Sequence, residues 1–264
     1  MKAKKMNILV VGATGSIGRH VVEIALSQGH NVIALCRSLS KASTLPNEAR
    51  KIFVDITEPE TLKQIDQPID AVVFTMGSDG LGKKGAMTVD YGGVRNILMM
   101  LKGKNVRIAL MTSVGVTNRE GNYNRRTEAH DWKRRSERLL RASGHPYTII
   151  RPGWFDYNND DEHKLVMLQG DQQHTGTPQD GVISRRQIAE VLLASLVESS
   201  ATEKTLELSA EKGAAQTNLS PLFAALTRDR EDKNDGPFDL ENMDTSDEPT
   251  HVQNDLREIR SMPS

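Results

Sequence analysis

The feature of the sequence that most limits its fold is a turn of three glycines, Gly12, Gly15 and Gly18, which follows the short apolar segment 7–11 and precedes a helix-like segment at 16–27. In such a strand–turn–helix unit the first glycine permits a tight turn, the second lets a pyrophosphate approach the backbone, and the third lets the helix pack closely on the strand. The helix N-terminus then presents free N–H groups to the anion. An ordinary strand-to-helix turn is the alternative, but the context favours a dinucleotide site that also includes Thr14, Ser16 and Ile17.

Short apolar segments alternate with amphipathic ones through the first 150 residues. The apolar segments are rich in Val, Ile and Leu and are predicted to be strands at 7–11, 31–36, 51–54, 71–75, 106–111 and 147–150. Helices are predicted between them at 16–27, 58–65, 88–101 and 127–143. This order is typical of a doubly wound parallel sheet, the Rossmann fold of the α/β class.

The pattern changes after Arg151-Pro152-Gly153. A loop leads to the segment 165–168. Ser184 and Gln187 have the spacing of a capping box, which predicts a helix from Ser184 to about residue 197, and a last strand is expected at 205–208. We expect one dinucleotide-binding domain over 1–228, with a cofactor core at 1–152 and a small substrate-side portion at 153–228. Residues 229–264 are acidic and polar, typical of a tail that is either flexible or wrapped around the domain.

Composition excludes several classes of protein. The formal net charge of −1 gives no general attraction to nucleic acid or to an anionic membrane. No stretch approaches the roughly 18 apolar residues of a membrane span, and the single Cys36 allows no internal disulfide. The histidines have no metal-ligand spacing, so no metal site is predicted. We expect a cytoplasmic monomer or homodimer that binds a small-molecule substrate.

The end of the second strand indicates which dinucleotide is bound. An NAD enzyme usually carries Asp or Glu there to bind the ribose 2′-hydroxyl. This chain has Arg37 and Ser38 instead, about 20 residues past the glycine turn. A guanidinium at this position would pair with a 2′-phosphate, so NADP(H) is predicted over NAD(H). The alternative is an ordinary surface arginine.

Taken together, these features resemble the short-chain dehydrogenase/reductase superfamily, in particular its atypical, NmrA-like branch. The resemblance covers about residues 6–208 and depends on an ordered series of motifs. The series comprises the glycine turn through Arg19, Asp55-Ile56, Met76-Gly77, Thr112-Ser113, Lys133 with Glu137, Ser143 to Gly153, and Ile183 to Ala189.

The resemblance implies roles for several of these residues. Asp55 and Ile56 would face the adenine, and Gly77 would line the cofactor backbone. Lys133 would reach the ribose hydroxyls, and Pro152 and Gly153 would flank the nicotinamide together with Trp154. Two residues have structural alternatives: Asp55 as a cap of the segment after it, and Trp154 as a core residue.

The chain departs from the superfamily at the catalytic tyrosine of the Tyr-x-x-x-Lys motif. If Lys133 is the lysine, the tyrosine position is Ala129. Three alternatives remain: Tyr123, on the loop after Ser113, supplies the proton; the acceptor is a flavin, quinone or similar molecule that needs no such tyrosine; or the protein binds NADP(H) without turnover, as a redox-sensing regulator. Ser113 is a candidate hydrogen-bond donor to substrate, or simply a loop cap.

Aromatic residues after the sixth strand, Trp154, Phe155 and Tyr157, are expected to form an apolar wall of the substrate pocket. The leading hypothesis is therefore an NADPH-dependent reductase of a small conjugated or carbonyl compound, and the rival is the non-enzymatic regulator. On the helix of Lys133 the arginines 134, 135, 138 and 141 are expected to lie on a charged, solvated face. A solvated face is also expected for His130 and Asp131, with the border of the substrate cleft as the alternative.

Overall fold

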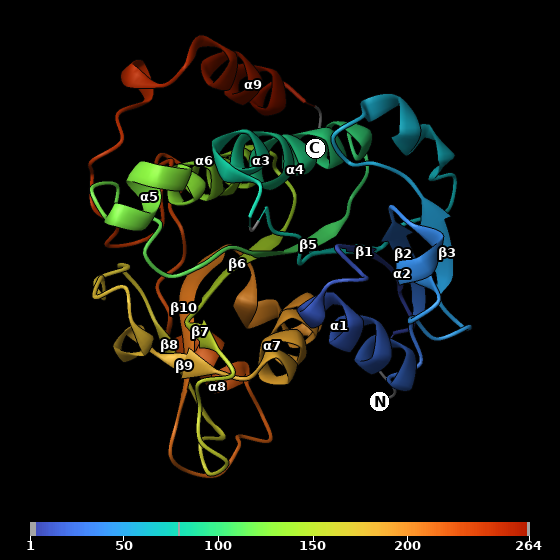
Figure 1. Cartoon of the computed structure of the whole chain (residues 1–264), viewed down its shortest axis with the longest axis horizontal. Helices are drawn as coiled ribbons and strands as arrows, with labels where there is room; N and C mark the ends of the chain where they lie inside the picture. Colours follow the sequence, from blue (N-terminus) through green and yellow to red (C-terminus); the bar gives the residue numbers. More distant parts are fainter. Residues whose placement is uncertain (1–3, 79, 263–264) are drawn as a thin grey trace.

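The computed structural model describes residues 4–78 and 80–262. Its centre is one sheet in the order β3-β2-β1-β4-β5-β6-β10-β9-β7, with β8 paired to β10 (Figure 1). The first six strands in the chain are β1 (Asn7–Val11), β2 (Asn31–Cys36), β3 (Arg50–Phe53), β4 (Ala71–Phe74), β5 (Arg107–Met111) and β6 (Tyr147–Pro152). They pair in parallel, as in β1 with β4, where Leu9 lies opposite Val72.

The predicted doubly wound parallel sheet is confirmed, with each of these six strands within two residues of its predicted bounds. The strand order reverses between β1 and β4, because β2 lies on one side of β1 and β4 on the other. Ligands of open α/β sheets bind beyond the carboxyl ends of the strands at such a switch point. The glycine turn after β1 lies at this place.

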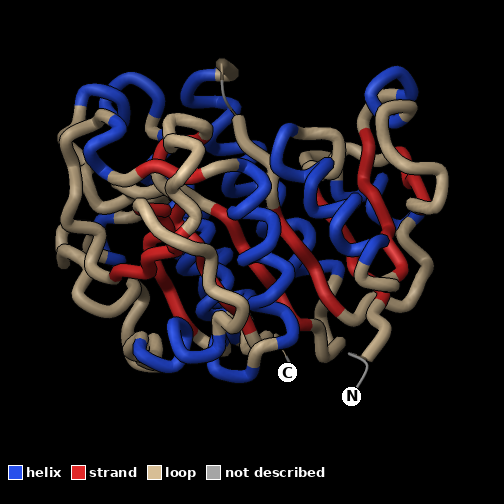
Figure 2. The backbone as a smooth tube through the Cα atoms, turned by 90° about the horizontal axis from the view of Figure 1, so that it is seen from below, coloured by secondary structure: helices blue, strands red, loops and turns tan. Residues whose placement is uncertain are grey.

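Two helical layers cover the sheet. On one face lie α1 (Ser16–Ser27) and α7 (Arg185–Val197), and on the other lie α4 (Gly93–Met100), α6 (Ala129–Ala142) and α9 (Thr250–Arg260) (Figure 1). Figure 2, seen from below, shows helices crossing the strands on the α1 and α7 side. Alternate residues of each strand enter one of two cores: Ile8 and Val10 face α1 and α7, whereas Leu9 and Val11 face the other layer.

The predicted helix 88–101 is longer than expected and is not uniform. Residues 82–100 are helical throughout, as α3 (Gly82–Gly85), the π-helical turn η2 (Ala86–Gly92) and α4. The segment predicted as a helix at 58–65 is a 3-10 helix, η1 (Pro59–Gln64). The predicted helix 127–143 begins at Ala129, because Glu128 has a left-handed backbone (φ 55°) that separates α6 from α5 (Asn122–Thr127).

Beyond β6 the chain extends the sheet with β7 (Trp154–Phe155), β8 (Lys164–Leu168), β9 (Val182–Ile183) and β10 (Lys204–Glu211). The capping box is confirmed: the Ser184 side chain accepts from the Gln187 amide, and the Gln187 side chain accepts from the Ser184 amide. Short helical segments η3 (Pro178–Asp180), η4 (Ser199–Ala201) and α8 (Ser220–Ala225) complete this part. No helix of residues 4–78 and 80–262 has the length and apolar content needed to cross a membrane.

Residues 229–262 lie along the outer side of α6 and end in η5 (Thr245–Asp247) and α9 (Figure 1). Val252, Leu256 and Ile259 of α9 are buried in the core on that face. The carboxylates of this segment meet the arginines of α6: Asp235 pairs with Arg134 and Arg138 at 2.9 and 2.7 Å.

The prediction of a solvated arginine face on α6 is therefore wrong. The side chains of Arg134 and Arg138 are 0% and 2% exposed, and Arg135 and Arg141 are also buried. Glu248 pairs with Arg135 and Arg138, and Asp229 pairs with Arg141. The sequence pattern of one helix does not reveal that segments about 100 residues later cover its charges.

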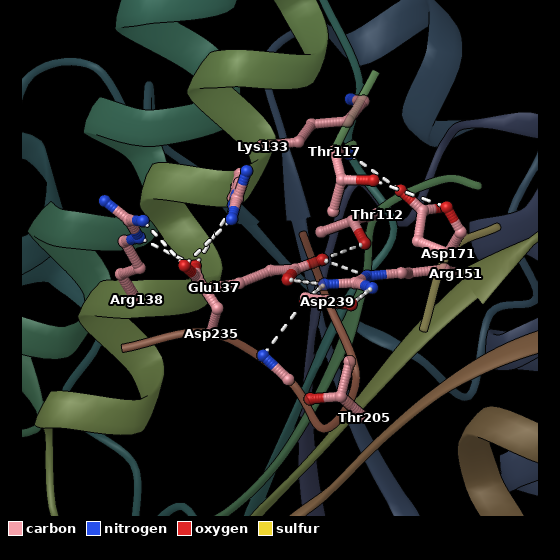
Figure 3. A network of polar contacts seen from close by, with 12 residues as sticks. Thr112, Thr117, Lys133, Glu137, Arg138, Arg151, Asp171, Thr205, Asp235 and Asp239 are labelled. Carbon is pink, nitrogen blue, oxygen red and sulfur yellow. Dashed lines mark hydrogen bonds and ion pairs between the residues drawn. The ribbon is translucent and has the colours of Figure 1, made fainter. Parts of the chain in front are cut away.

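The network of charges continues to the ends of β5 and β6 (Figure 3). Glu137 of α6 accepts hydrogen bonds from Thr112 (2.7 Å) and from Arg151 (2.7 Å). Arg151 also pairs with Asp239 at 2.7 Å. These buried contacts hold Thr112, the residue before Ser113, and Arg151 near the end of β6, so the network supports the edge of the sheet where the candidate site lies.

Candidate functional site

The glycine turn has the close packing that its sequence predicts. Gly12 has φ 88°, and a Cβ on it would lie 2.6 Å from the backbone nitrogen of Met76. A Cβ on Gly18 would lie 2.1 Å from the Gly12 carbonyl oxygen, so α1 approaches β1 as only glycine allows. A Cβ on Gly15 would meet only that same oxygen, at 3.1 Å. Gly15 is thus not required by packing, and its open side lies at the N-terminus of α1.

Around this turn, Gly15 and Ser16 are exposed, Thr14 is half-buried and Ile17 is buried in the core. Gly15 is the N-cap of α1 and has an extended backbone (φ −73°), and no side chain caps the helix. The free N–H groups of the first turn therefore point to solvent beside Gly15, where an anion would bind.

The end of β2 carries the residues that are predicted to select the dinucleotide. Arg37 is exposed, and its guanidinium makes no hydrogen bond or ion pair with the described part of the chain. Ser38 caps the short helix α2 (Leu39–Ala42) by accepting from the Lys41 amide. The Arg37 charge is therefore available to a ligand at the carboxyl end of β2.

The loops after β3 and β4 lie on the same edge of the sheet. Asp55 accepts from the amide and hydroxyl of Thr57 at 2.9 and 2.8 Å, so it does cap the segment after it. The buried Asn96 of α4 holds this loop by donating to the Ile56 carbonyl (2.9 Å). Gly77 is exposed directly after β4.

Lys133 of α6 points to Asp90 of η2, with 3.1 Å between Nζ and Oδ1. The Ser78 hydroxyl donates to the other oxygen of the same carboxylate, which is almost completely buried. Lys133 and Asp90 thus fix α6 against η2 next to the β4 loop. Ala129, at the place of the missing tyrosine, is buried in the core.

A cavity of about 480 Å³ lies at the carboxyl ends of β5 and β6. It brings together the predicted residues Ser113, Tyr123, Pro152, Gly153, Trp154 and Phe155. The hydroxyl oxygen of Ser113 is buried and has no hydrogen-bond partner among the described residues. A ligand in the cavity would supply that partner, which is a reason for a polar group of the ligand to lie there.

The remaining predicted pocket residue lies outside this lining. Tyr157 is 62% exposed and stacks edge-on against Trp154, with ring centroids 5.9 Å apart. Trp154 itself is 36% exposed, so it is a wall of the cavity and not a core residue. Position 153 must be glycine for the chain to pass this close to Gly181, since a Cβ there would lie 2.4 Å from the Gly181 carbonyl oxygen.

Arg185, the first residue of α7, connects the glycine turn to the cavity wall. Its Nε donates to the Ser16 hydroxyl at 3.0 Å, and its guanidinium pairs with Asp156 and lies 5.5 Å from the centre of the Phe155 ring. Through Arg185 the glycine turn at one end of the candidate site is therefore in contact with the cavity wall at the other end.

Two histidines that are not among the predicted site residues also line the cavity. The prediction that His130 and Asp131 lie on a solvated helix face is wrong, because Asp131 is buried and His130 borders the cavity. The His130 ring packs against Gly115 and lies tilted by 54° to the Tyr123 ring, with 5.1 Å between the ring centroids. Tyr123 lies on α5, not on a loop. Asn124 explains the position of His130: its side-chain oxygen accepts from the amides of residues 130 and 131 and caps α6.

The second histidine, His174, lies on the loop between β8 and η3. Its Nε2 is 3.5 Å from Asp171 Oδ2 and 3.2 Å from the Thr117 hydroxyl. Asp171 also accepts from the amides of Gly115 (2.6 Å) and Thr117 (2.7 Å), so it holds the loop after β5. The spacing of Asp171 and His174 is the only sign of this pair in the sequence, and it is common in loops.

The two histidines have opposite environments. Burial lowers the pKa of His130 to about 4, so it is neutral near pH 7. The hydrogen bond to Asp171 raises the pKa of His174 above that of an ordinary histidine. Burial alone would raise the pKa of Asp171, but the hydrogen bonds from His174 and from the loop amides, together with the charge of Arg151, hold that pKa below its usual range.

The residues at this edge of the sheet fit a nicotinamide dinucleotide. The open Gly15 side of the turn fits a pyrophosphate, Arg37 fits a phosphate on the adenosine ribose, and the unpartnered Ser113 hydroxyl faces the half of the sheet that takes the nicotinamide in such folds. Within residues 4–78 and 80–262, no group of three or more His, Cys, Asp or Glu side chains is placed to hold a metal ion.

Comparison with known proteins agrees with this geometry. The model of the NAD(P)H-binding family matches residues 12–199. The protein TIC 62 of rice chloroplasts (Oryza sativa subsp. japonica) is 31% identical over 222 residues, which cover 72% of this chain and 44% of that protein. The chain thus spans less than half the length of this relative.

Solved structures share the fold. The short-chain dehydrogenase/reductase of Veillonella parvula DSM 2008 in complex with NADP superposes with a TM-score of 0.61 at 17% identity, over 81% of this chain and 98% of that one. The anaerobilin reductase ChuY of Escherichia coli O157:H7 superposes with a TM-score of 0.61 at 20% identity, over 79% and 100% of the two chains.

Proposed function

Because the chain belongs to the NAD(P)H-binding family, we propose that it is an NADPH-dependent reductase of a small conjugated or carbonyl compound. The observation that carries the proposal is the position of the cavity of Ser113. It lies at the carboxyl ends of β5 and β6, on the edge of the sheet that also holds the glycine turn. In a doubly wound fold this half of the sheet takes the nicotinamide end of a dinucleotide. A substrate in the cavity would therefore lie beside the reactive ring.

The walls of the cavity favour a flat, conjugated substrate. Trp154, Phe155 and Pro152 form apolar surfaces, and few polar groups interrupt them. The burial of Ala129 argues against the usual tyrosine–lysine proton transfer, because no hydroxyl is present at that place. A flavin- or quinone-like acceptor fits both observations.

The preference for NADPH is tested at Arg37. In Arg37→Asp a carboxylate would face the 2′-phosphate, and the charge-assisted bond would be lost. Such a bond contributes roughly 1.5–3 kcal/mol, so NADPH affinity should fall about tenfold or more in a fluorescence titration, while NADH affinity should hold or rise.

Lys102→Asp is the matched control, since it makes the same change of charge at the exposed turn after α4. It should leave the affinity for both dinucleotides unchanged. Equal NADPH affinity in Arg37→Asp and the wild type would show that Arg37 is only a surface arginine.

The absent tyrosine also favours a second candidate, an NADP(H)-binding regulator without turnover. The oxidation of NADPH is followed with menadione, FMN and a set of aldehydes as acceptors. Turnover with any of them supports the reductase. Tight NADPH binding without turnover of any acceptor supports the regulator.

A further inference from the structure

His174, in the lining of the cavity, contacts the carboxylate of Asp171 through one ring nitrogen and has a second ring nitrogen that is not used in this contact. We propose that His174, oriented by Asp171, is the catalytic acid that protonates the substrate in the cavity. The inference rests on the proposed reductase function and gives the missing tyrosine's task to a different element, the loop before η3.

The first support is geometric. His174 lines the cavity with Ser113 and Trp154, and its Nε2 faces Asp171 and the Thr117 hydroxyl. A carboxylate on one ring nitrogen fixes the tautomer and the orientation of the ring. The contacts of the ring with Asp171 and with the Thr117 hydroxyl are both made by Nε2, so neither of them occupies the second nitrogen, Nδ1. It is the nitrogen that remains for a ligand.

The second support is that Asp171 holds more than the histidine. The same carboxylate binds the amides of Gly115 and Thr117, in the loop that begins with Ser113. The acid and the hydroxyl that would hold the substrate oxygen are therefore set relative to each other by one residue. Asp171 has a left-handed backbone (φ 47°), which is a strained conformation for a non-glycine residue.

The charged groups around the ring come from several segments and agree with this role. Asp171 and Asp180 favour the charged imidazole, and His130 across the cavity is neutral near pH 7. Burial raises the pKa of Glu207, on β10 behind Asp171, to about 7, and Arg151 lies beyond that carboxylate. Of the two histidines in the cavity, only His174 is in an environment that keeps a proton available.

The reaction balances with this one group. A bound reduced nicotinamide supplies a hydride to the substrate. His174 supplies a proton from Nδ1 to the oxygen or nitrogen that gains the electron pair, so one N–H bond breaks and one O–H or N–H bond forms. The substrate is reduced by two electrons, the dinucleotide is oxidised, and the neutral imidazole regains its proton from water.

His174→Gln tests the proposal, with His163→Gln as the control at an exposed histidine outside the cavity. NADPH turnover of FMN and menadione is measured from pH 5.5 to 9. The wild type and the control should lose activity as pH rises through the His174 pKa, since the acid must be protonated. His174→Gln should be about 10²–10⁴-fold slower with a flat profile in this range, at unchanged NADPH affinity.

A second measurement does not depend on turnover. The imidazole pKa of His174, measured by NMR in the protein without cofactor, should lie above that of His163 and should fall in Asp171→Asn. A His174 pKa at or below that of His163 overturns the proposal. So does an unchanged pH profile in His174→Gln, which leaves the reductase function intact. Tight NADPH binding without wild-type turnover overturns the reductase function and this proposal together.

Discussion

The glycine turn and the arginine network of α6 are two regions that organise the same edge of the sheet by opposite means. The turn uses backbone contacts within seven residues, such as the close approach of Gly18 to the Gly12 carbonyl. The network uses charged side chains that meet across about 100 residues of sequence, as Arg134 and Asp235 do. The first region is open to a ligand, whereas the second is closed by the chain itself.

Because of this difference, substitutions in the turn are expected to affect ligand binding, and substitutions in the network are expected to affect the stability of the fold. Gly15 contributes little packing and lies where an anion would bind, so the absence of a side chain at this position matters for the ligand. The guanidiniums of Arg134 and Arg138 contact no candidate ligand, but they are buried, and each depends on a carboxylate for neutralisation. Burying such charges is costly unless they are paired and hydrogen-bonded.

The largest expected effect is on the network. Asp235→Asn removes the charge that neutralises two buried guanidiniums, and breaking a buried pair in this way typically costs about 3–5 kcal/mol. The free energy of unfolding, measured with urea, should fall by that amount, while the NADPH affinity of the folded protein should be unchanged.

The control is Asp232→Asn, the same change three residues earlier, where the carboxylate pairs with Arg230 in solvent. It should have no measurable effect on unfolding, because exposed pairs contribute little. If both variants unfold alike, the buried network does not stabilise the fold.

Glu207 lies at the margin of the network, and its negative charge should destabilise the fold, whereas that of Asp235 stabilises it. Glu207 is 3.6 Å from an Arg151 nitrogen, but Arg151 is already shared by Glu137 and Asp239 at 2.7 Å, so burial dominates and raises the pKa of Glu207 to about 7. Because this folded-state pKa lies above the usual value near 4.5, ionisation destabilises the fold as pH rises from about 4.5 to 7.

Glu207→Gln should therefore be more stable than the wild type by up to about 3 kcal/mol at pH 8, and equal to it near pH 4.5. Urea unfolding at the two pH values measures the difference. Glu211→Gln, on the same strand but exposed, is the control and should show no such dependence. A Glu207→Gln variant that loses stability at pH 8 would mean that the pair with Arg151 outweighs burial.

The smallest effect on stability is expected at the turn. Gly15 has an extended backbone that Val can adopt, but Val is a poor N-cap and its Cβ would lie 3.1 Å from the Gly12 carbonyl oxygen, so Gly15→Val should lower the unfolding free energy by about 1 kcal/mol. The side chain would fill the space of the pyrophosphate and abolish NADPH binding. Circular dichroism and cofactor fluorescence measure the two effects.

Gly121→Val is the control, because Gly121 is also an N-cap glycine with an extended backbone (φ −60°), at the start of α5 and away from the glycine turn. A Cβ there would lie 2.9 Å from the Asn118 side-chain amide, which must shift to make room. NADPH affinity should persist in it. Full NADPH binding by Gly15→Val would reduce the turn to a structural feature.

The same contrast explains what the sequence could predict. The strands, the turn and the cap at Ser184 are set by neighbours within a few residues, so pattern and propensity reveal them. The burial of the α6 arginines depends on Asp229, Asp235 and Glu248, which nothing in α6 itself indicates.

Within the candidate site the limit is the same. Ser113, Pro152 and Gly153 follow strands and could be placed at the edge of the sheet, because the carboxyl ends of parallel strands meet there. His174 comes from a loop whose course depends on β8 and β10, and its role is visible only once Asp171 is seen beside Gly115 and Thr117.

The long sequence separations in the arginine network set an order of events during synthesis. Arg134 leaves the ribosome about 100 residues before Asp235, and Arg138 precedes Glu248 by 110 residues. At about 5–20 residues per second, α6 waits roughly 5–20 s with its guanidiniums in water before their partners arrive. The sheet and the glycine turn can form in that interval. The closure of the acidic segment over α6 therefore comes after the synthesis of the sheet strands, and the nascent chain presents a positively charged helix until then.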